Sequence, residues 1–356
     1  MKRSYLNKLA GLSGLLLVAI QSWAQSAPPT PDALDKPALQ SAKSERATLL
    51  SVARAGARLV AAGERGIILT SDDNGKSWKQ ALVPTSVNLT ALSFVDAQQG
   101  WAVGHMGVVL HTEDGGLSWQ KQLDGVEAAR LAVEAVRDSD NERAIKQANY
   151  LVSDGPDKPF FDIMMDAQGR GFAIGAFNLI FYTEDGGKHW RYWSPRLENP
   201  YGLHLYGITR LGDDYIIVGE QGLLLRSQDG GEHFESLETP YEGSWFGVLA
   251  TRKGTLLVYG LRGNAYVSLD GGESWQPSET GSQVGVSDAI ELEDGRVVLA
   301  NQAGQLLVSS DSGQHFQPLG GLPGMPLASL TQAGSGQLVL ASLRGLGQVP
   351  SSVPSH

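Results

Sequence analysis

The chain contains no cysteine among its 356 residues. Disulfides, thiolate nucleophiles and cysteine-ligated metals are therefore excluded together. Cations are also in the minority, with 28 Lys and Arg against 38 Asp and Glu and a formal net charge of −10. This acidity argues against a nucleic-acid backbone or an anionic membrane surface as the main partner.

The first 24 residues have the layout of a secretory signal peptide. Lys2, Arg3 and Lys8 form a basic start, residues 9–20 form an apolar core, and residues 22–24 read Ser-Trp-Ala. The apolar run is shorter than the roughly 20 residues that span a bilayer, which disfavours an uncleaved transmembrane helix. No cysteine stands near the cleavage site to carry a lipid. We therefore expect an exported protein, in a bacterial periplasm, with no direct membrane insertion after cleavage.

One pattern, [S/T]-x-D-x-G-x-x-[W/F], occurs six times in the chain. Its aspartates are Asp73, Asp114, Asp185, Asp229, Asp270 and Asp311. Its aromatic residues are Trp78, Trp119, Trp190, Phe234, Trp275 and Phe316. Successive aspartates are 41, 71, 44, 41 and 41 residues apart. A period of about 40 residues indicates a solenoid, propeller or array, so we expect one repeat domain over residues 47–349.

Each repeat predicts four short β-strands. In the first repeat these are an opening strand at 48–52, a hairpin of 58–63 and 67–70, and a strand that follows the Asp turn. The hairpin turns start at Gly63, Gly104, Gly175, Gly219, Gly260, Asn301 and Ser342, and each ends three residues later in Gly or Asn. That final residue supplies the positive φ of a tight turn. The turns therefore count seven units, one more than the Asp turns.

The seventh unit, residues 327–349, lacks the Asp turn and a fourth strand, and a short tail of residues 350–356 follows it. In closed propellers the other end of the chain usually supplies a missing outer strand. Residues 25–46, an arm rich in Pro, Ala and Ser, are the candidate donor. We therefore expect this arm to add the closing strand.

The long interval between Asp114 and Asp185 contains an insertion at 125–159, after the second unit. Ala, Leu, Glu and Arg dominate it, and its apolar residues recur every three or four positions. This pattern predicts two short helices joined near Ser139 and Asp140, the second capped by Asp140 or Asn141. A disordered loop is the alternative.

In the Asp turn, the carboxylate is expected to accept backbone N–H bonds and the Gly to take a positive φ. The Ser or Thr that begins the pattern is expected to bond to the Asp, and the aromatic residue to pack between neighbouring sheets. Six Asp as acid catalysts or metal ligands is the alternative, but one copy per unit spreads them around a ring. The same spacing keeps His189, His233 and His315 from meeting at one metal.

The pattern resembles the Asp-box, or BNR repeat, of sialidases, sortilin-type receptors and the photosystem II stability/assembly factor family. The last of these resembles the chain most, through residues 96–104, which end in G-W-A-V-G, and residues 112–119. The resemblance implies an all-β, seven-bladed β-propeller of four-stranded blades, here with a helical insertion between blades 2 and 3. It also implies a protein that binds a partner to assist assembly of a membrane complex. The insertion departs from the family pattern, no binding residue of the family can be matched, and nothing in the sequence indicates a photosystem.

Strand order places the hairpin turns and the blade-to-blade crossovers on one face of a propeller, opposite the Asp turns. We predict that the face with the hairpin turns binds a partner protein, because loops on a repeating scaffold carry function. Its candidate residues are Arg65, His105, Phe177, Tyr201, Tyr206, Tyr241, Trp245, Phe246, Arg262 and Arg344. Arg, Tyr and Trp are enriched in interface hot spots.

Two other function classes stay open. A sialidase-like glycoside hydrolase needs converging arginines, a Tyr nucleophile with a carboxylate, and a second acid. The chain has Arg and Tyr on the expected face but no F-R-I-P-like phrase. A carbohydrate- or ligand-binding propeller would use Tyr201, Tyr241 and Trp245 as stacking platforms. The first choice remains a non-catalytic binding protein without a cofactor or metal.

Overall fold

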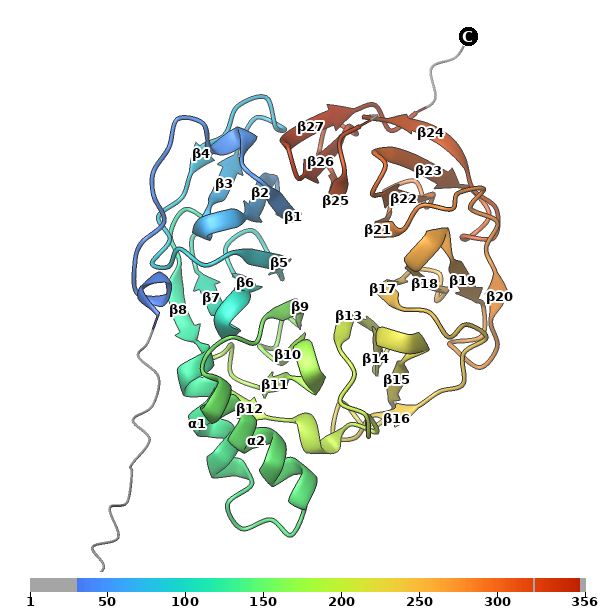
Figure 1. The fold of residues 1–356 in the computed structure, drawn as a ribbon. Helices are drawn as coiled ribbons and strands as arrows, with labels where there is room; N and C mark the ends of the chain where they lie inside the picture. Colours follow the sequence, from blue (N-terminus) through green and yellow to red (C-terminus); the bar gives the residue numbers. More distant parts are fainter. Residues whose placement is uncertain (1–30, 323, 353–356) are drawn as a thin grey trace, which may run out of the picture.

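A computed structural model describes residues 31–322 and 324–352 of the chain. Their strands form seven antiparallel sheets arranged as a ring (Figure 1). Residues of all seven inner strands line a central channel. Six sheets have four strands and the last has three. In every sheet, strands that follow one another in the chain are neighbours, so each blade runs from an inner to an outer strand. The seven-bladed β-propeller that the family resemblance implies is confirmed, and the number of blades agrees with the seven hairpin turns.

The first three blades flank the helical insertion. Blade 1 contains β1 (Leu49–Ala55), β2 (Arg58–Gly63), β3 (Ile68–Ser71) and β4 (Lys79–Gln80). Blade 2 contains β5 (Leu89–Phe94), β6 (Gly100–Gly104), β7 (Val109–Thr112) and β8 (Gln120–Leu123). The helices α1 (Gly125–Ala135) and α2 (Glu142–Asp154) follow. Blade 3 contains β9 (Phe160–Met165), β10 (Gly171–Gly175), β11 (Ile180–Thr183) and β12 (Arg191–Tyr192).

The remaining four blades complete the ring. Blade 4 contains β13 (Leu205–Leu211), β14 (Asp214–Gly219), β15 (Leu224–Ser227) and β16 (Glu235–Ser236). Blade 5 contains β17 (Trp245–Ala250), β18 (Leu256–Gly260), β19 (Ala265–Ser268) and β20 (Gln276–Pro277). Blade 6 contains β21 (Val286–Glu291), β22 (Val297–Asn301), β23 (Gln305–Ser309) and β24 (Gln317–Gly321). Blade 7 contains β25 (Leu327–Gln332), β26 (Leu338–Ser342) and β27 (Gly345–Val349).

The core lies between the blades. The second strand of each blade is apolar and buried along almost its whole length, as in β6 and β10. Such a strand is covered by a neighbouring blade on each face, so it reads as a continuous apolar run instead of an alternating one. A cluster with Phe172, Ile217 and Phe234 fills the space between blades 3 and 4. Packing of this kind repeats around the ring.

Each inner strand contains a β-bulge at its second residue. In blade 1, Leu49 pairs with Gly63 and Ser51 with Ala62, which leaves Leu50 between them unpaired. The same shift occurs in the other six blades. The unpaired residues are Leu50, Thr90, Phe161, Tyr206, Phe246, Ser287 and Ala328, and each directly precedes a small or acidic residue of the channel wall. Each blade therefore has one residue at the channel that is not paired with the neighbouring strand of its own sheet.

The expected closing strand is wrong for the part of the arm that the structure describes. Residues 31–46 form two short 3₁₀ helices, Asp32–Leu34 and Ser44–Arg46, and no strand. Leu34 is fully buried between blades 1 and 2, and Ala38 donates its N–H to the carbonyl of Val83 at 3.0 Å. The blade 7 sheet keeps three strands among the described residues. Residues 25–30 of the arm and the signal segment 1–24 lie outside the described residues.

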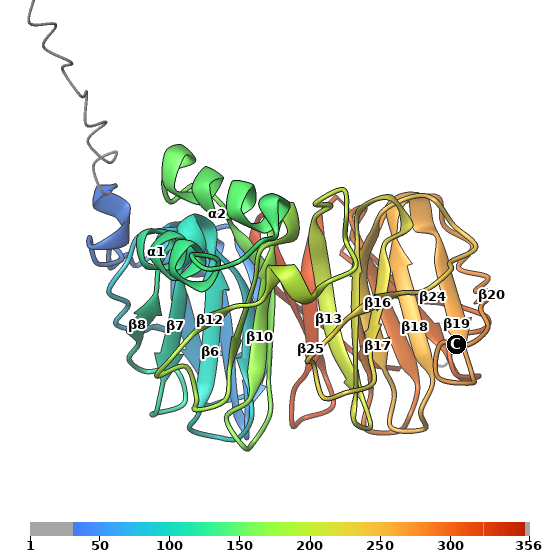
Figure 2. The same cartoon turned by 90° about the horizontal axis from the view of Figure 1, so that it is seen from below.

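The helical prediction for the insertion is confirmed. Asp124 caps α1 by accepting the N–H groups of Val126 and Glu127, and Asn141 caps α2 by accepting the N–H of Ala144. Figure 2 shows both helices beside blades 2 and 3 at one face of the ring. The buried faces of the helices consist mostly of alanine, including Ala132 and Ala148. Small side chains let the two helices approach each other and the blades closely.

Candidate functional site

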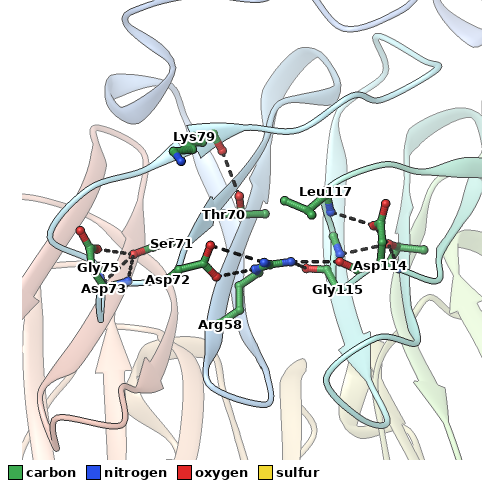
Figure 3. A network of polar contacts seen from close by, with 12 residues as sticks. Arg58, Thr70, Ser71, Asp72, Asp73, Gly75, Lys79, Asp114, Gly115 and Leu117 are labelled. Atoms are coloured by element: carbon green, nitrogen blue, oxygen red, sulfur yellow. Dashed lines mark hydrogen bonds and ion pairs between the residues drawn. The ribbon is translucent and has the colours of Figure 1, made fainter.

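The Asp turns have the structural role that the sequence predicts. In the first, Ser71 donates to Asp73 at 2.8 Å, and the N–H of Ser77 donates to the same carboxylate at 2.9 Å. Gly75 has a φ of +84°. Arg58 joins two turns, since it pairs with Asp72 at 2.7 Å and donates to the carbonyl of Asp114 in the next blade at 2.9 Å (Figure 3). The turns thus also link neighbouring blades.

These hydrogen bonds hold the turn carboxylates in their charged form. The hydroxyl and backbone N–H of Ser77, with the hydroxyl of Ser71, lower the pKa of Asp73 to about 2. Hydrogen bonds to the charged form of an acid favour that form. The Asp turns are therefore poor proton donors at neutral pH, in agreement with a structural role.

The three histidines before the motif aromatics also belong to these turns. The Nδ1 atoms of His189, His233 and His315 lie 2.6, 2.9 and 2.7 Å from the carboxylates of Asp185, Asp229 and Asp311. Ser77, Ser118 and Ser274 hold the same place in other blades. Within residues 31–322 and 324–352, no three His, Asp or Glu side chains are placed to share a metal ion.

The motif aromatics pack between blades as expected. Trp119, Trp190, Phe234 and Phe316 are buried, and each belongs to a cluster with side chains of the preceding blade. Trp78 and Trp275 are partly buried against the clusters of blades 7 and 1 and of blades 4 and 5. Burying an aromatic side chain removes about 150–250 Å² from water. These residues hold neighbouring blades together.

The opposite face carries the hairpin turns, five of which form a short 3₁₀ turn with a left-handed residue at the apex. The apex residues are Arg65, Met106, Phe177, Gln221 and Arg262, with φ between 53° and 59°. The final Gly or Asn also has a positive φ, as predicted. Because five blades share this conformation, it is a property of the repeat and does not mark one blade as a site. It does direct Arg65, Phe177 and Arg262 into solvent.

Most of the predicted binding residues are on the surface of this face. Arg65, His105, Arg262 and Arg344 are exposed, as are Phe177 (60%) and Tyr201 (86%). Among the described residues, no carboxylate forms an ion pair with Arg65, Arg262 or Arg344. These arginines lie on blades 1, 5 and 7, so they form an arc and not a single cluster. Unpaired arginines can each form bidentate bonds to an acidic ligand.

Trp245 is not a surface residue. It is completely buried as the first residue of β17, where it packs against Tyr241 and Tyr266 with ring centroids 4.9 and 5.6 Å away. Tyr241 is partly buried, and its hydroxyl donates to the carbonyl of Leu261 at 3.2 Å. The sequence prediction of Trp245 as a partner contact or stacking platform is therefore wrong. The start of each inner strand is a core position.

Tyr206 and Phe246 lie at the mouth of the central channel, where Phe161 joins them. The Tyr206 ring is 5.3 Å from that of Phe161 and 6.1 Å from that of Phe246, centroid to centroid. His204 contacts both Phe177 and Tyr206 and so connects the mouth to the surface. Sequence reasoning missed Phe161. Aligning the opening strands would have found it, because it holds the same position as Tyr206 and Phe246.

The channel has a volume of about 460 Å³ and contains two carboxylates that the sequence did not single out. Burial raises the pKa of Asp162 to about 7, against the opposing effect of the N–H groups of Ile208 and Ile163. Burial likewise raises the pKa of Asp288 to about 6. The Tyr259 hydroxyl lies 3.5 Å from Asp288, and burial raises its pKa well above the usual value. The channel is thus the most perturbed acid–base environment described.

A second hollow separates α2 from blade 3. It has a volume of about 400 Å³ and lies between Tyr150 and Leu151 of α2 and Phe177 and Tyr201 of the hairpin face. The ammonium of Lys158 lies 5.4 Å from the centroid of the Phe177 ring. The insertion therefore extends the hairpin face outwards.

The fold and the Asp turns define this chain as an Asp-box β-propeller. The family described as photosynthesis system II assembly factor YCF48 matches residues 76–152 and 150–319. These segments cover more than half of the chain, and the chain belongs to this family. The resemblance stated from residues 96–104 and 112–119 is confirmed.

One relative and several solved structures resemble parts or all of the chain. The photosystem II assembly lipoprotein Ycf48 of Synechococcus sp. (strain CC9902) is 31% identical over 96 residues, 26% of this chain and 29% of that relative. The match therefore spans less than a third of the relative's length. A structure of YCF48 bound to a D1 peptide is 20% identical, with a TM-score of 0.62 over 87% of this chain and 97% of that one. YCF48 from Cyanidioschyzon merolae is 15% identical, with a TM-score of 0.61 over 86% and 96%.

Proposed function

We propose that this protein is an exported, non-catalytic binding scaffold that assists the assembly or stability of a membrane protein complex. The face that carries the hairpin turns binds a segment of a partner protein. The single observation that carries this proposal is the set of exposed arginines on that face, which form no ion pair within the described part of the chain, in a member of the YCF48 family. The similar YCF48 structure with a D1 peptide supports a peptide segment as the ligand. An acidic segment is the chemistry that arginines recognise best.

The arrangement of arginines supports binding over glycoside hydrolysis. Arg65, Arg262 and Arg344 stand on the tips of separate blades, and the arginine that lines the described channel is Arg54, which pairs with Glu293 at 2.8 Å. A sialidase-like site needs several arginines directed at one substrate. Its other partners would be a Tyr nucleophile and two acids.

Export to the periplasm is part of the proposal and is supported by the layout of residues 1–24. Among the helices that the structure describes, none is long and apolar enough to cross a membrane. Fractionation of cells that express the full chain, with N-terminal sequencing of the product, tests this part. A product that begins at Met1 in the cytoplasm would contradict it.

The binding face is tested by changing Arg65, Arg262 and Arg344 together to Ala. If each arginine contributes on the order of 1 kcal/mol, capture of the partner falls about tenfold or more, with an unchanged melting temperature. The matched control changes Lys76, Lys188 and Lys253, which are exposed cations of the opposite face, to Ala. The readout is cross-linking in native periplasm followed by mass spectrometry. Equal loss of the same partner in both variants would contradict the proposal.

A further inference from the structure

The mouth of the central channel is an arc of aromatic rings on three successive blades. Phe161, Tyr206 and Phe246 are the bulged second residues of β9, β13 and β17, and all three line the channel. Inner strands begin at the hairpin face, because their first residues pair with the residue that starts the hairpin turn, as Leu49 does with Gly63. The rings therefore line one side of the opening, on the face that also carries Arg65, Arg262 and Arg344. Each ring is half-buried and presents a surface to the channel.

The two channel carboxylates lie one residue deeper. Asp162 directly follows Phe161, and Asp288 holds the same place on β21 across the ring. A strand rises about 3.3 Å per residue, so the acids lie just below the level of the rings. The wall of blades 4 and 5 has Gly207 and Gly247 at this level. A Cβ on Gly247 would be 2.3 Å from the Tyr259 hydroxyl, which occupies that place instead.

Both carboxylates lack a cation. Asp162 accepts the N–H groups of Ile163 at 2.8 Å and Ile208 at 3.0 Å, and Asp288 accepts those of Ala289 at 2.8 Å and Leu330 at 2.9 Å. Asp288 is also bonded by the Ser329 side chain and lies 3.5 Å from the Tyr259 hydroxyl. Both oxygens of Asp162 can accept a further bond. Neither acid forms an ion pair within residues 31–322 and 324–352.

Among the described residues, no other group of the channel wall supplies a positive charge to the two carboxylates. Besides the two acids, the ionisable groups of the wall are Tyr206 and Tyr259, whose pKa values burial raises, and Arg54, which pairs with Glu293. Arg54 is three residues further along its strand than Ser51, the residue that corresponds to Asp162, and so lies towards the Asp-turn face. Two acids without a counter-charge in a confined channel are costly when ionised. A cation entering from the hairpin face would remove that cost.

We propose that the channel binds a primary ammonium group on a flexible alkyl chain, with the two carboxylates as its counter-charges and the three rings around the chain. Aromatic faces attract an ammonium electrostatically, and their apolar surface suits the methylene groups that carry it. The ammonium belongs either to a lysine side chain or to a free diamine. A volume of about 460 Å³ is within the usual range of ligand sites.

Calorimetric titration of cadaverine (1,5-diaminopentane) into the protein at pH 8 tests the site. We expect saturable binding that falls about tenfold or more in a variant with Asp162→Asn and Asp288→Asn. Phe161→Ala with Tyr206→Ala is expected to weaken binding severalfold. The control variant, Asp138→Asn with Asp140→Asn, removes two exposed charges of the insertion and is expected to bind as the wild type does. Absence of saturable binding, or equal affinity in the channel variant and the control, would overturn the proposal.

The wild-type protein offers a second test that needs no variant. Because the pKa values of Asp162 and Asp288 are about 7 and about 6, affinity is expected to rise between pH 5 and pH 8 as both acids ionise. Binding near pH 6.5 is expected to release protons, which titration in buffers of different ionisation enthalpy measures. The His204 ring adjoins the mouth, so His204→Gln serves as a control. Affinity that is flat with pH, or no proton release, would contradict the assignment.

The source of the ammonium is decided by a second titrant. A capped peptide with one lysine is compared with its acetyl-lysine form and with cadaverine. Binding of the lysine peptide alone or of both amines assigns a protein ligand, and binding of cadaverine alone assigns a free diamine. The variant without Arg65, Arg262 and Arg344 is expected to bind cadaverine normally. The experiments therefore distinguish a wrong proposal for the arginines of the hairpin face from a wrong proposal for the channel site.

Discussion

Aspartates of one chain have opposite acid–base behaviour because their surroundings differ. In the Asp turns, the carboxylate accepts several short hydrogen bonds and its pKa falls, as for Asp73. In the channel, Asp162 accepts two backbone N–H groups, but burial outweighs them and its pKa rises. The turn acids therefore stabilise the fold above about pH 4, and the channel acids stabilise it below neutrality. Stability is expected to be greatest between these limits.

The Asp162→Asn variant tests the predicted effect of the channel acids on stability. The folded-state pKa of Asp162, about 7, is above the value of about 4 for an exposed aspartate. Its stabilising contribution is complete below pH 4 and is lost as the pH rises through 7. We expect wild-type stability to fall by on the order of 1 kcal/mol more than that of the variant between pH 5 and pH 8. Urea unfolding at both pH values measures this, and Asp138→Asn is the exposed control.

A substitution of Asp114 tests the predicted stabilising role of the carboxylates in the Asp turns. Its carboxylate accepts bonds from Thr112, Leu117 and Ser118 at 2.6–3.0 Å. Asp114→Ala leaves these donors without their partner, which is expected to cost about 1–3 kcal/mol of unfolding free energy. Glu113→Ala removes an exposed neighbouring carboxylate and is expected to change stability by less than about 0.5 kcal/mol. Equal urea midpoints for the two variants would contradict the role given to the turn.

At the scale of elements, the repeat made the strands and turns predictable. Each Asp turn and each hairpin turn has a local cause, such as the positive φ of Gly75 and Gly66, that sequence displays directly. The arm has no such local signal for its structure. Its composition favours an extended segment, but Leu34 and Ala38 are buried between blades 1 and 2. Long-range burial of this kind is not encoded in local pattern, and for that reason the expected closing strand was wrong for residues 31–46.

The docked arm gives a prediction at this scale. Leu34 is completely buried, whereas Leu39, five residues away, is 77% exposed. Leu34→Ala is expected to lower the free energy of unfolding by about 2–4 kcal/mol, because it opens a cavity in the first interblade cluster. Leu39→Ala is expected to have little effect. Thermal unfolding of both variants measures the difference, and equal melting temperatures would show that the arm does not contribute to stability.

At the scale of the whole molecule, the part of the chain that the structure describes closes the ring without a strand shared between blades 7 and 1. Blades 7 and 1 meet through side chains: Ser329 accepts the N–H of Val52 at 3.3 Å, and Gln348 donates to the carbonyl of Asn74 at 3.0 Å. An apolar cluster that includes Leu49 and Val339 lies behind these bonds. Closure by packing makes the three-stranded blade sufficient, so no extra strand is required among the described residues.

The candidate site was predictable only in part. Strand order alone placed the arginine tips on one face, and the exposed positions of Arg65, Arg262 and Arg344 agree with it. Trp245 was misplaced because a core position and a loop position are adjacent in sequence at the start of β17. The sequence could not show that Asp162 and Asp288 line one channel, because that depends on the closure of the ring, which brings blades 3 and 6 to the same space.

Deleting the helical insertion tests whether the seven blades fold without it. Gly125 and Pro156 lie side by side, since a Cβ on Gly125 would be 2.7 Å from the Cβ of Pro156. Replacing residues 126–155 by Gly-Ser should therefore keep the seven blades, with a lower melting temperature because Trp190 and Tyr192 lose part of their cover. Circular dichroism, thermal unfolding and cadaverine titration measure these outcomes, and the channel is expected to bind cadaverine unchanged. The control inserts Gly-Ser after Asp140, between the helices. Loss of β-structure in the deletion variant but not in the control would show that the insertion is part of the folding core.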